Sequence, residues 1–279
     1  MIVSPRTATL AATLLAALGT ATASGAAVPS SEMPEPLKQV RYEQKIGAKI
    51  APDLTFFDET GRAVRTGEVF ARRPAILVLA YYHCPMLCDM VLQGVEGGLK
   101  ALSLDPGRDF DVVVVSIDPR ENPQLARKKK AEIVGRYKRP GTEGGWHFLT
   151  GTEKEIQALA DTVGFHYVRD AVNDQFAHAA GLVMVAPGGT VSRYLFGIEF
   201  APRDLKLGLI ESAHGKLGNA VVNQILLYCF HYDPVTGRYS AVTLRIVRIA
   251  AVATLIGIVL MVVLLRRRET AAPGPLGAA

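Results

Sequence analysis

The sequence predicts an α/β fold in which helices cover both faces of a central mixed sheet. Continuous apolar runs at residues 74–83 and 111–118 are typical of strands buried inside such a sheet. A segment with helical periodicity follows each run, and the alternation ends in a strand hairpin and a helix. Roughly 200 residues lie between the two apolar ends of the chain, which is the size of one domain with one core.

The expected elements run from residue 54 to residue 230. Residues 54–70 alternate around a turn and predict a β-hairpin. A helix over residues 86–104 follows the first apolar strand. Asn122 and Pro123 are suited to the start of a basic helix that ends near residue 137. The remaining elements are a strand at 147–149, a helix at 152–163, a hairpin at 180–197, and helices at 202–213 and 219–230. This order is that of a thioredoxin-like fold.

The N-terminal residues 1–26 are typical of a secretory signal peptide. One arginine precedes a short apolar run that ends in small residues, with Ala21–Ala23 as a cleavage site. An uncleaved anchor is the alternative, but the run is short for a membrane span of about 20 residues. Residues 27–50 are rich in proline, serine and charge and are expected to be a linker to a domain at 51–216.

The C-terminal part of the chain contains a second apolar segment. Residues 249–265 carry no charge, which predicts a transmembrane helix over 246–265 after a juxtamembrane extension at 217–245. A buried core helix is rarely apolar on every face. Arg266–Arg268 then place the tail 266–279 in the cytoplasm, because positive charge collects on that side. The domain is therefore expected on the periplasmic side of the inner membrane.

The charge and the cysteine content exclude two classes of protein. The net charge of +5 owes much to the arginine triplet and to Lys128–Lys130, so it does not indicate nucleic-acid binding. Three cysteines are too few for a disulfide scaffold. The close pair among them therefore needs its own explanation.

Cys84 and Cys88 follow the first apolar strand directly. Pro85 suits the first position of a helix, so Cys84 is expected at a helix N-terminus, where the helix dipole stabilises a thiolate. Cys88 lies one turn later on the same face. The CxxxC spacing is wider than the CxxC of thiol oxidoreductases and favours a metal between the sulfurs, with copper suited to soft thiolates. A structural or redox-active disulfide, or two buried thiols, is the alternative.

Four sequence blocks occur in a characteristic order. They are Cys84–Cys88, Val115–Pro123, Trp146–Gly151, and the His178 segment before the late hairpin. On these blocks the chain resembles the Sco/SenC family of copper proteins of cytochrome c oxidase assembly, over residues 47–215. The tail resembles that of a membrane-tethered, PrrC-like branch of the family.

The resemblance implies a thioredoxin-like fold and a copper ion, Cu(I) or Cu(II), bound by Cys84, Cys88 and His178. It implies, as partner, the copper-accepting subunit of cytochrome c oxidase or another copper enzyme. His178 also stands just before a buried strand, which would place it at the same sheet edge as the cysteine corner.

The sequence departs from the family pattern next to this histidine. The residue before it is often aspartate in the family, whereas this chain has Ala177. Asp118 and Asp174 are therefore candidates for orienting the His178 ring, with strand-end capping as the alternative.

Further candidate ligands flank the main motif and the membrane segment. His83 and Met86 are candidates for a weak extra copper ligand, although such neighbours more often only pack. Cys229 and His231 are a candidate second, transient copper site near the bilayer. An aromatic belt of Tyr228, Phe230 and Tyr232 at the membrane interface is the plainer explanation of that segment.

Two functions use the same residues. A metallochaperone would carry copper between the thiolates and His178 and release it by ligand exchange, with no catalytic turnover. A thiol–disulfide oxidoreductase would use Cys84 as nucleophile and Cys88 as resolving thiol to reduce the cysteines of an oxidase copper site. His178 discriminates between them, because thiol exchange needs no imidazole. A peroxidase is disfavoured, and a redox-sensing role for the pair remains open.

Overall fold

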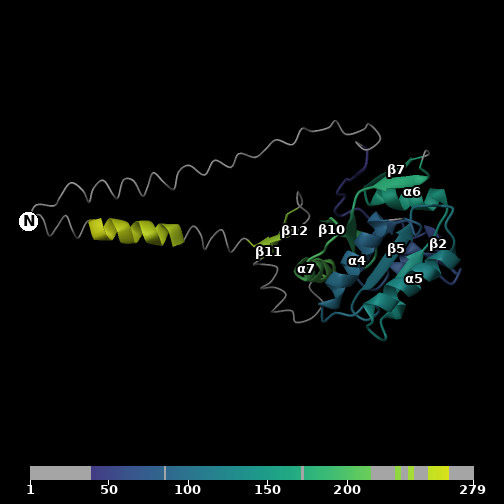
Figure 1. Ribbon diagram of the computed structural model, residues 1–279, viewed down its shortest axis with the longest axis horizontal. Coiled ribbons are helices and arrows are strands. Elements are labelled where there is room, and N and C mark those ends of the chain that lie inside the picture. The colour runs from purple at the N-terminus through teal and green to yellow at the C-terminus, as the bar shows by residue number, and fades with distance from the viewer. Residues whose placement is uncertain are drawn as a thin grey trace, which may run out of the picture. The chain divides into compact units, whose positions relative to one another are not determined.

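The computed structural model describes residues 39–84, 86–170, 173–214, 230–233, 238–241 and 251–263 (Figure 1). The compact unit that contains them begins at Gln39. Within this unit, two separate sheets position the residues of the candidate site.

A five-stranded mixed sheet forms the centre of the domain, in the order β10-β9-β4-β5-β6. Strands β4 (Ala75–Ala80), β5 (Asp111–Ser116) and β6 (Trp146–Leu149) are parallel. Strand β9 (Gly181–Ala186) is antiparallel to β4 and to β10 (Thr190–Phe196). Every residue of β4, β5 and β9 is buried, as the continuous apolar runs of the sequence predicted.

The helices connect and cover these strands. Helix α4 (Leu87–Lys100) joins β4 to β5, and α5 (Pro123–Tyr137) joins β5 to β6. Each helix crosses from one parallel strand to the next, and both crossings run the same way along the sheet. The rule that such crossovers are right-handed therefore places both helices on the same face of the sheet. Helix α4 contacts α5 and also α7 (Pro202–Ser212), whereas α6 (Glu153–Thr162) packs against β7. The predicted cap of α5 is confirmed, because the Asn122 side chain accepts a hydrogen bond from a first-turn amide.

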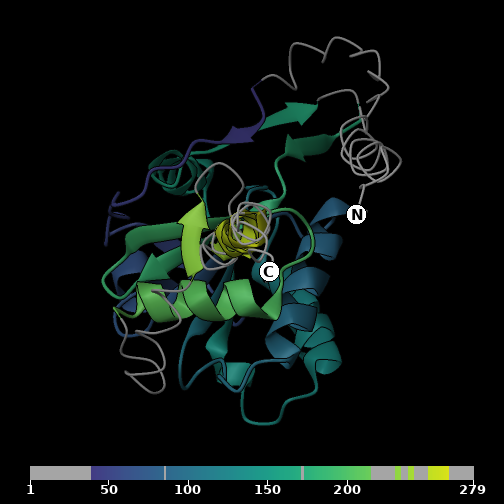
Figure 2. The same cartoon turned by 90° about the vertical axis from the view of Figure 1, so that its left-hand side faces the viewer.

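A second, smaller sheet carries the candidate histidine. It has the order β1-β7-β8 and consists of β1 (Arg41–Tyr42), β7 (Phe165–Asp170) and β8 (Gln175–His178), all antiparallel (Figures 1 and 2). The sequence analysis predicted none of these three strands. The strands joined to the cysteine corner and the strand with His178 therefore belong to different sheets.

Part of the predicted linker belongs to the folded domain. The backbone N–H of Glu43 donates to Gly164 at 2.7 Å, and that of Gly47 donates to Val191 at 2.8 Å. Ile50 is 2% exposed and lies in the core. The expected linker boundary at residue 50 is therefore wrong, because several residues between 41 and 50 pair with chain more than a hundred positions later.

Two further predictions concern local elements. The hairpin expected at 54–70 is confirmed over 55–65 as β2 (Thr55–Phe57) and β3 (Ala63–Arg65). Its expected last residues form the short helix α3 (Thr66–Val69) instead. The helix expected at 219–230 is wrong at its last residue, which begins strand β11 (Phe230–Asp233). That strand pairs with β12 (Arg238–Ala241), and residues 219–229 lie outside the described residues.

The predicted membrane segment is described only in its middle. Residues 251–263 are helical and exposed. Within the described part of the chain, the structure contains no helix with both the length and the apolarity that a membrane crossing requires. The predicted signal at 1–26, the rest of the span and the tail at 266–279 lie outside the described residues.

Candidate metal centre

Cys84, Cys88 and His178 come together in the structure as the sequence predicted. Their possible ligand atoms, the two Sγ atoms and a ring nitrogen, all lie within 4.8 Å of one another. Cys84 and His178 are each 8% exposed, and Cys88 is 1% exposed. The three donors therefore form a compact group that is largely shielded from water.

The cysteine pair lies at the corner between β4 and α4. The strand ends at Ala80, and the chain turns with the Cys84 amide donating to the Tyr81 carbonyl at 3.3 Å. Helix α4 begins at Leu87, and the Cys88 amide in its first turn donates to Cys84 Sγ at 3.3 Å. The Cys84 sulfur thus accepts one of the amides that a helix leaves unpaired at its N-terminus. Pro85, predicted at the first helical position, lies outside the described residues.

His178 is the last residue of β8, and its ring is oriented by the backbone carbonyl of the next residue. Its Nδ1 lies 3.1 Å from the Ala179 carbonyl, which can only accept, so Nδ1 carries the proton. Its Nε2 lies 3.0 Å from Cys88 Sγ and therefore faces the cysteine pair. The prediction that the Asp118 or Asp174 carboxylate orients this ring by direct contact is wrong, because both carboxylates bind arginine instead.

Aromatic rings surround the histidine. The Tyr81 ring centroid lies 6.2 Å from that of His178 in an edge arrangement, and the Phe165 centroid lies 5.9 Å away. Phe176 packs against Tyr81 at 5.4 Å. These contacts keep water from the imidazole and limit its rotation.

The two thiols have opposite pKa shifts. A hydrogen bond from Cys88 holds the pKa of Cys84 well below its usual range although burial opposes it, and His178 adds to the lowering. Burial and the neighbouring Cys84 sulfur raise the pKa of Cys88. Without metal, the pair therefore consists of a Cys84 thiolate and a Cys88 thiol that share one proton.

The two predicted flanking ligands point away from this centre. The His83 side chain is 73% exposed, and its Nδ1 lies 3.2 Å from the Glu121 carboxyl group. Met86 is 65% exposed and precedes the first turn of α4. The structure thus brings neither side chain into the cluster. Of the candidate second site, Cys229 lies outside the described residues and His231 is described only as part of β11.

Glu121 is a site residue that the sequence analysis missed. Its side chain is 2% exposed, and its two carboxyl oxygens accept from the backbone amides of Tyr82 and His83, both at 2.8 Å. The Ser116 hydroxyl donates to the same carboxyl group at 2.6 Å. Glu121 therefore fixes the two residues before Cys84. No local pattern signals this contact, since its partners lie nearly 40 residues earlier in the chain.

The SCO1/SenC family model matches residues 43–206, which is more than half of the chain and includes all three candidate ligands. The chain belongs to the SCO1/SenC family. Among curated proteins, none matches this sequence. The mixed sheet with its helices is consistent with the thioredoxin-like fold that the order of elements predicted. The match also extends into the residues that the sequence analysis had assigned to a linker.

Three solved structures are similar to this chain, and the first of them supports the fold. A proposed electron transfer protein from Aquifex aeolicus VF5 matches with a TM-score of 0.54 and 21% identity, covering 62% of this chain and 96% of its own. Arabidopsis thaliana ScoI with copper bound matches with a TM-score of 0.46 and 19% identity, covering 59% and 98%. Bradyrhizobium japonicum ScoI with copper bound matches with a TM-score of 0.45 and 17% identity, covering 61% and 98%.

The donor set of this SCO1/SenC chain suits copper. Thiolates are soft ligands and imidazole is a borderline one. Copper binds such ligands well, whereas hard cations prefer oxygen ligands. Metal bonds of about 2.0–2.3 Å, as in zinc sites with the same donors, put the ligand atoms of a trigonal ion about 4 Å apart. The observed separations within 4.8 Å require only small adjustments, and a bound ion would displace the proton now shared by the sulfurs.

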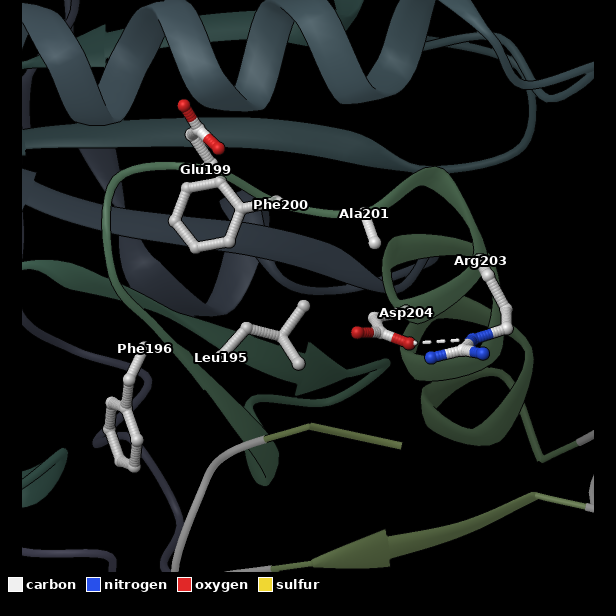
Figure 3. Close-up of a pocket in the computed structure, with 7 residues that line it drawn as sticks. All are labelled: Leu195, Phe196, Glu199, Phe200, Ala201, Arg203 and Asp204. Carbon is white, nitrogen blue, oxygen red and sulfur yellow. Dashed lines mark hydrogen bonds and ion pairs between the residues drawn. The ribbon is translucent and has the colours of Figure 1, made fainter. Parts of the chain in front are cut away.

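A separate hollow lies between β10 and α7 (Figure 3). It measures about 390 Å³, and Arg203 forms an ion pair with the buried Asp204 at 3.0 Å at its edge. None of the described residues that line it is cysteine or histidine. This hollow is therefore not part of the metal centre.

Proposed function

We propose that this protein is a copper metallochaperone that delivers copper to a cytochrome c oxidase during assembly. The observation that carries the proposal is the buried group of Cys84, Cys88 and His178, which supplies two thiolates and one imidazole at a single point. Among the proteins of similar structure is BsSco, a member of the Sco family of cytochrome c oxidase assembly proteins. A copper site of such an oxidase, or of another copper enzyme, is the proposed acceptor.

Ligand exchange would move the copper from carrier to acceptor. Copper is the cargo, and a thiolate or imidazole of the acceptor replaces one ligand of the carrier at a time. Cys84 and His178 are less buried than Cys88, at 8% against 1% exposure, so an incoming ligand would reach the metal more easily beside either of them than beside Cys88. No bond of the carrier other than those to copper forms or breaks.

The proposal includes a location on the periplasmic side of the inner membrane. The apolar residues 249–265, followed by Arg266–Arg268, support a single transmembrane helix with a cytoplasmic tail, and residues 1–26 support export. Tethering would raise the effective concentration of the carrier near a membrane-bound acceptor. Protease added to intact spheroplasts should digest the domain and leave the C-terminal tail protected.

A thiol–disulfide oxidoreductase is the second candidate, favoured by the split between a Cys84 thiolate and a Cys88 thiol. The Cys84 thiolate would attack a disulfide of the partner and release one partner thiolate. Cys88 would lose its proton, attack Cys84 Sγ and release the second partner thiolate. Two electrons pass to the partner, and this protein ends with a Cys84–Cys88 disulfide. The imidazole of His178 has no step in this sequence.

Copper loading separates the two functions. The full chain in detergent is reduced, loaded anaerobically with Cu(I) or with Cu(II), and compared with Cys84→Ser, His178→Ala and, as a matched thiol control, Cys229→Ser. A chaperone is expected to bind one copper with thiolate-to-copper charge transfer that His178→Ala weakens and Cys84→Ser abolishes. Loss of a second equivalent in Cys229→Ser would identify the additional site with His231. No retained copper, together with rapid reduction of a disulfide substrate, would refute the chaperone and support the oxidoreductase.

A further inference from the structure

The third candidate ligand is carried by a different sheet from the other two. Cys84 and Cys88 follow β4 of the central sheet, whereas His178 ends β8 of the small sheet. The position of the imidazole over the sulfurs therefore depends on how the β7–β8 hairpin is fixed against the cysteine corner. Strand β8 pairs with β7 and not with a central strand, so hydrogen bonds between strands fix this position only indirectly.

An arginine bridges the two parts. Arg120, in the loop after β5, donates from Nε and one terminal nitrogen to Asp118, at 2.8 and 2.7 Å. Its other terminal nitrogen donates to both carboxylate oxygens of Asp174, at 2.8 and 2.9 Å. Asp174 immediately precedes β8, four residues before His178. One guanidinium thus links the central-sheet side to the turn of the histidine hairpin.

The bridge crosses a hollow. A cavity of about 560 Å³ is lined by Tyr81 and Arg120 on the side of the corner and by Asp174 and Gln175 on the side of the hairpin. At this end of the hairpin, the charged bridge takes the place of close apolar packing. The ring of Tyr81 also contacts the hairpin, through the rings of Phe176 and His178.

We propose that Arg120 and Asp174 are positioning residues that hold His178 over the cysteine pair and so set the strength of the third copper ligand. This inference rests on the proposed copper function. Cu(I) is well satisfied by two thiolates, whereas Cu(II) needs the imidazole and further ligands. Breaking the bridge therefore weakens Cu(II) binding more than Cu(I) binding.

Asp174→Asn is the variant that opens the bridge most cleanly. It keeps the shape of the side chain and leaves the pair of Arg120 with the buried Asp118 intact. Asparagine also tolerates the left-handed backbone at this position, where φ is 52°. Arg169→Gln is the matched control. Arg169 binds the same carboxylate at 2.7 Å and is similarly exposed, but it lies on β7 of the same hairpin and does not reach the central sheet.

The affinities of the full chain for Cu(I) and Cu(II) are measured by competition for wild type and both variants. Asp174→Asn is expected to weaken Cu(II) binding about fivefold, the size of an exposed ion-pair contribution, with a smaller effect on Cu(I). If only the Cu(II) affinity changes, the reduction potential of the bound Cu(II)/Cu(I) couple rises by about 40 mV, because a fivefold change in affinity corresponds to about 0.7 of the 59 mV per decade. The thiolate-to-Cu(II) charge-transfer band of Asp174→Asn should change in the same direction as in His178→Ala, but by less. Arg169→Gln should change none of these quantities.

A measurement without copper separates this inference from the proposed function. Cys88 Sγ lies 3.0 Å from His178 Nε2, so a loosened hairpin uncovers this thiol. Alkylation of Cys88 in the metal-free protein should be severalfold faster in Asp174→Asn than in wild type or Arg169→Gln. Equal alkylation rates and equal copper affinities in all three proteins would overturn the positioning role. If Asp174→Asn speeds alkylation of Cys88 but the protein binds no copper, the positioning role of the bridge stands and only the copper function is refuted.

Discussion

Replacing Glu121 by glutamine tests how the corner before Cys84 is held. The two carboxyl oxygens of Glu121 accept from the backbone amides of Tyr82 and His83, and the Ser116 hydroxyl donates to one of them. A glutamine of the same size has one accepting oxygen and one donating NH₂ group. Whichever way the amide is turned, the NH₂ group faces a backbone N–H of the corner. One buried amide is then left without an acceptor.

The cost follows from this count. A buried donor without a partner costs about 1–3 kcal/mol, and a hydrogen bond to a charged group contributes about 1.5–3 kcal/mol. Because the two figures overlap in part, Glu121→Gln is expected to lower the free energy of unfolding by about 2–4 kcal/mol. For a domain of this size, each kcal/mol corresponds to about 2–4 °C in Tm. A decrease of about 5–15 °C is therefore expected.

The only tryptophan of the chain, Trp146, is fully buried in β6 and reports global unfolding through its fluorescence. Urea unfolding of wild type, Glu121→Gln and the control Glu143→Gln gives the comparison. Glu143 is exposed, so its replacement should change the free energy of unfolding by less than about 0.5 kcal/mol. If Glu121→Gln is as stable as this control, the carboxyl group does not hold the corner and the reasoning is wrong.

Two further predictions concern the helix and the thiol next to this corner. A Cβ at Gly94 of α4 would lie 1.9 Å from the Ile198 carbonyl oxygen, so Gly94→Ala should destabilise the domain by about 1–3 kcal/mol in urea unfolding. Gly97 of the same helix faces open space, and Gly97→Ala should stabilise by up to about 1 kcal/mol; equal effects would contradict the packing. Because Cys88 and His178 hold the pKa of Cys84 below its usual range, iodoacetamide should alkylate Cys84 at nearly constant rates from pH 8 to pH 5. An ordinary thiol with a pKa of about 8.5 slows about tenfold per pH unit below that value, and such a decrease here would refute the thiolate assignment.

The central sheet could be predicted from the sequence because its strands β4, β5 and β9 are buried on both faces. The runs that became β4 and β5 are continuous and apolar, and the start of α5 is marked by Asn122. Strand β7 has a mixed, partly exposed pattern, and β8 has only four residues. Neither carries a local signal, since these strands exist through pairing with each other and with β1. The predicted linker failed for the same reason, because Ile50 is buried by partners that local composition does not reveal.

The residues of the candidate site could be predicted where their spacing in the sequence indicates their chemistry. Cys84 and Cys88 lie one helical turn apart, and the sequence blocks of the SCO1/SenC family added His178. The supporting contacts were not predictable in this way. Glu121 and Arg120 are neighbours in a loop, yet one binds amides of the cysteine corner and the other binds the hairpin of the histidine. Such contacts are set by the tertiary fold, which also made Asp174 a partner of arginine and not of His178.

The copper carrier proposed above must release its cargo, so its ligands cannot all be equally fixed. Cys84 and Cys88 sit on one continuous corner that the buried Glu121 braces, whereas His178 reaches them from a separate sheet. The bridge through Arg120 is half exposed, and exposed ion pairs contribute only about 0–1 kcal/mol each. On the proposed copper function, the imidazole is therefore the ligand expected to leave at the lowest cost. Two thiolates then remain, and these still suit Cu(I). In the proposed transfer, a ligand of the acceptor can therefore bind the copper before the two cysteines release it.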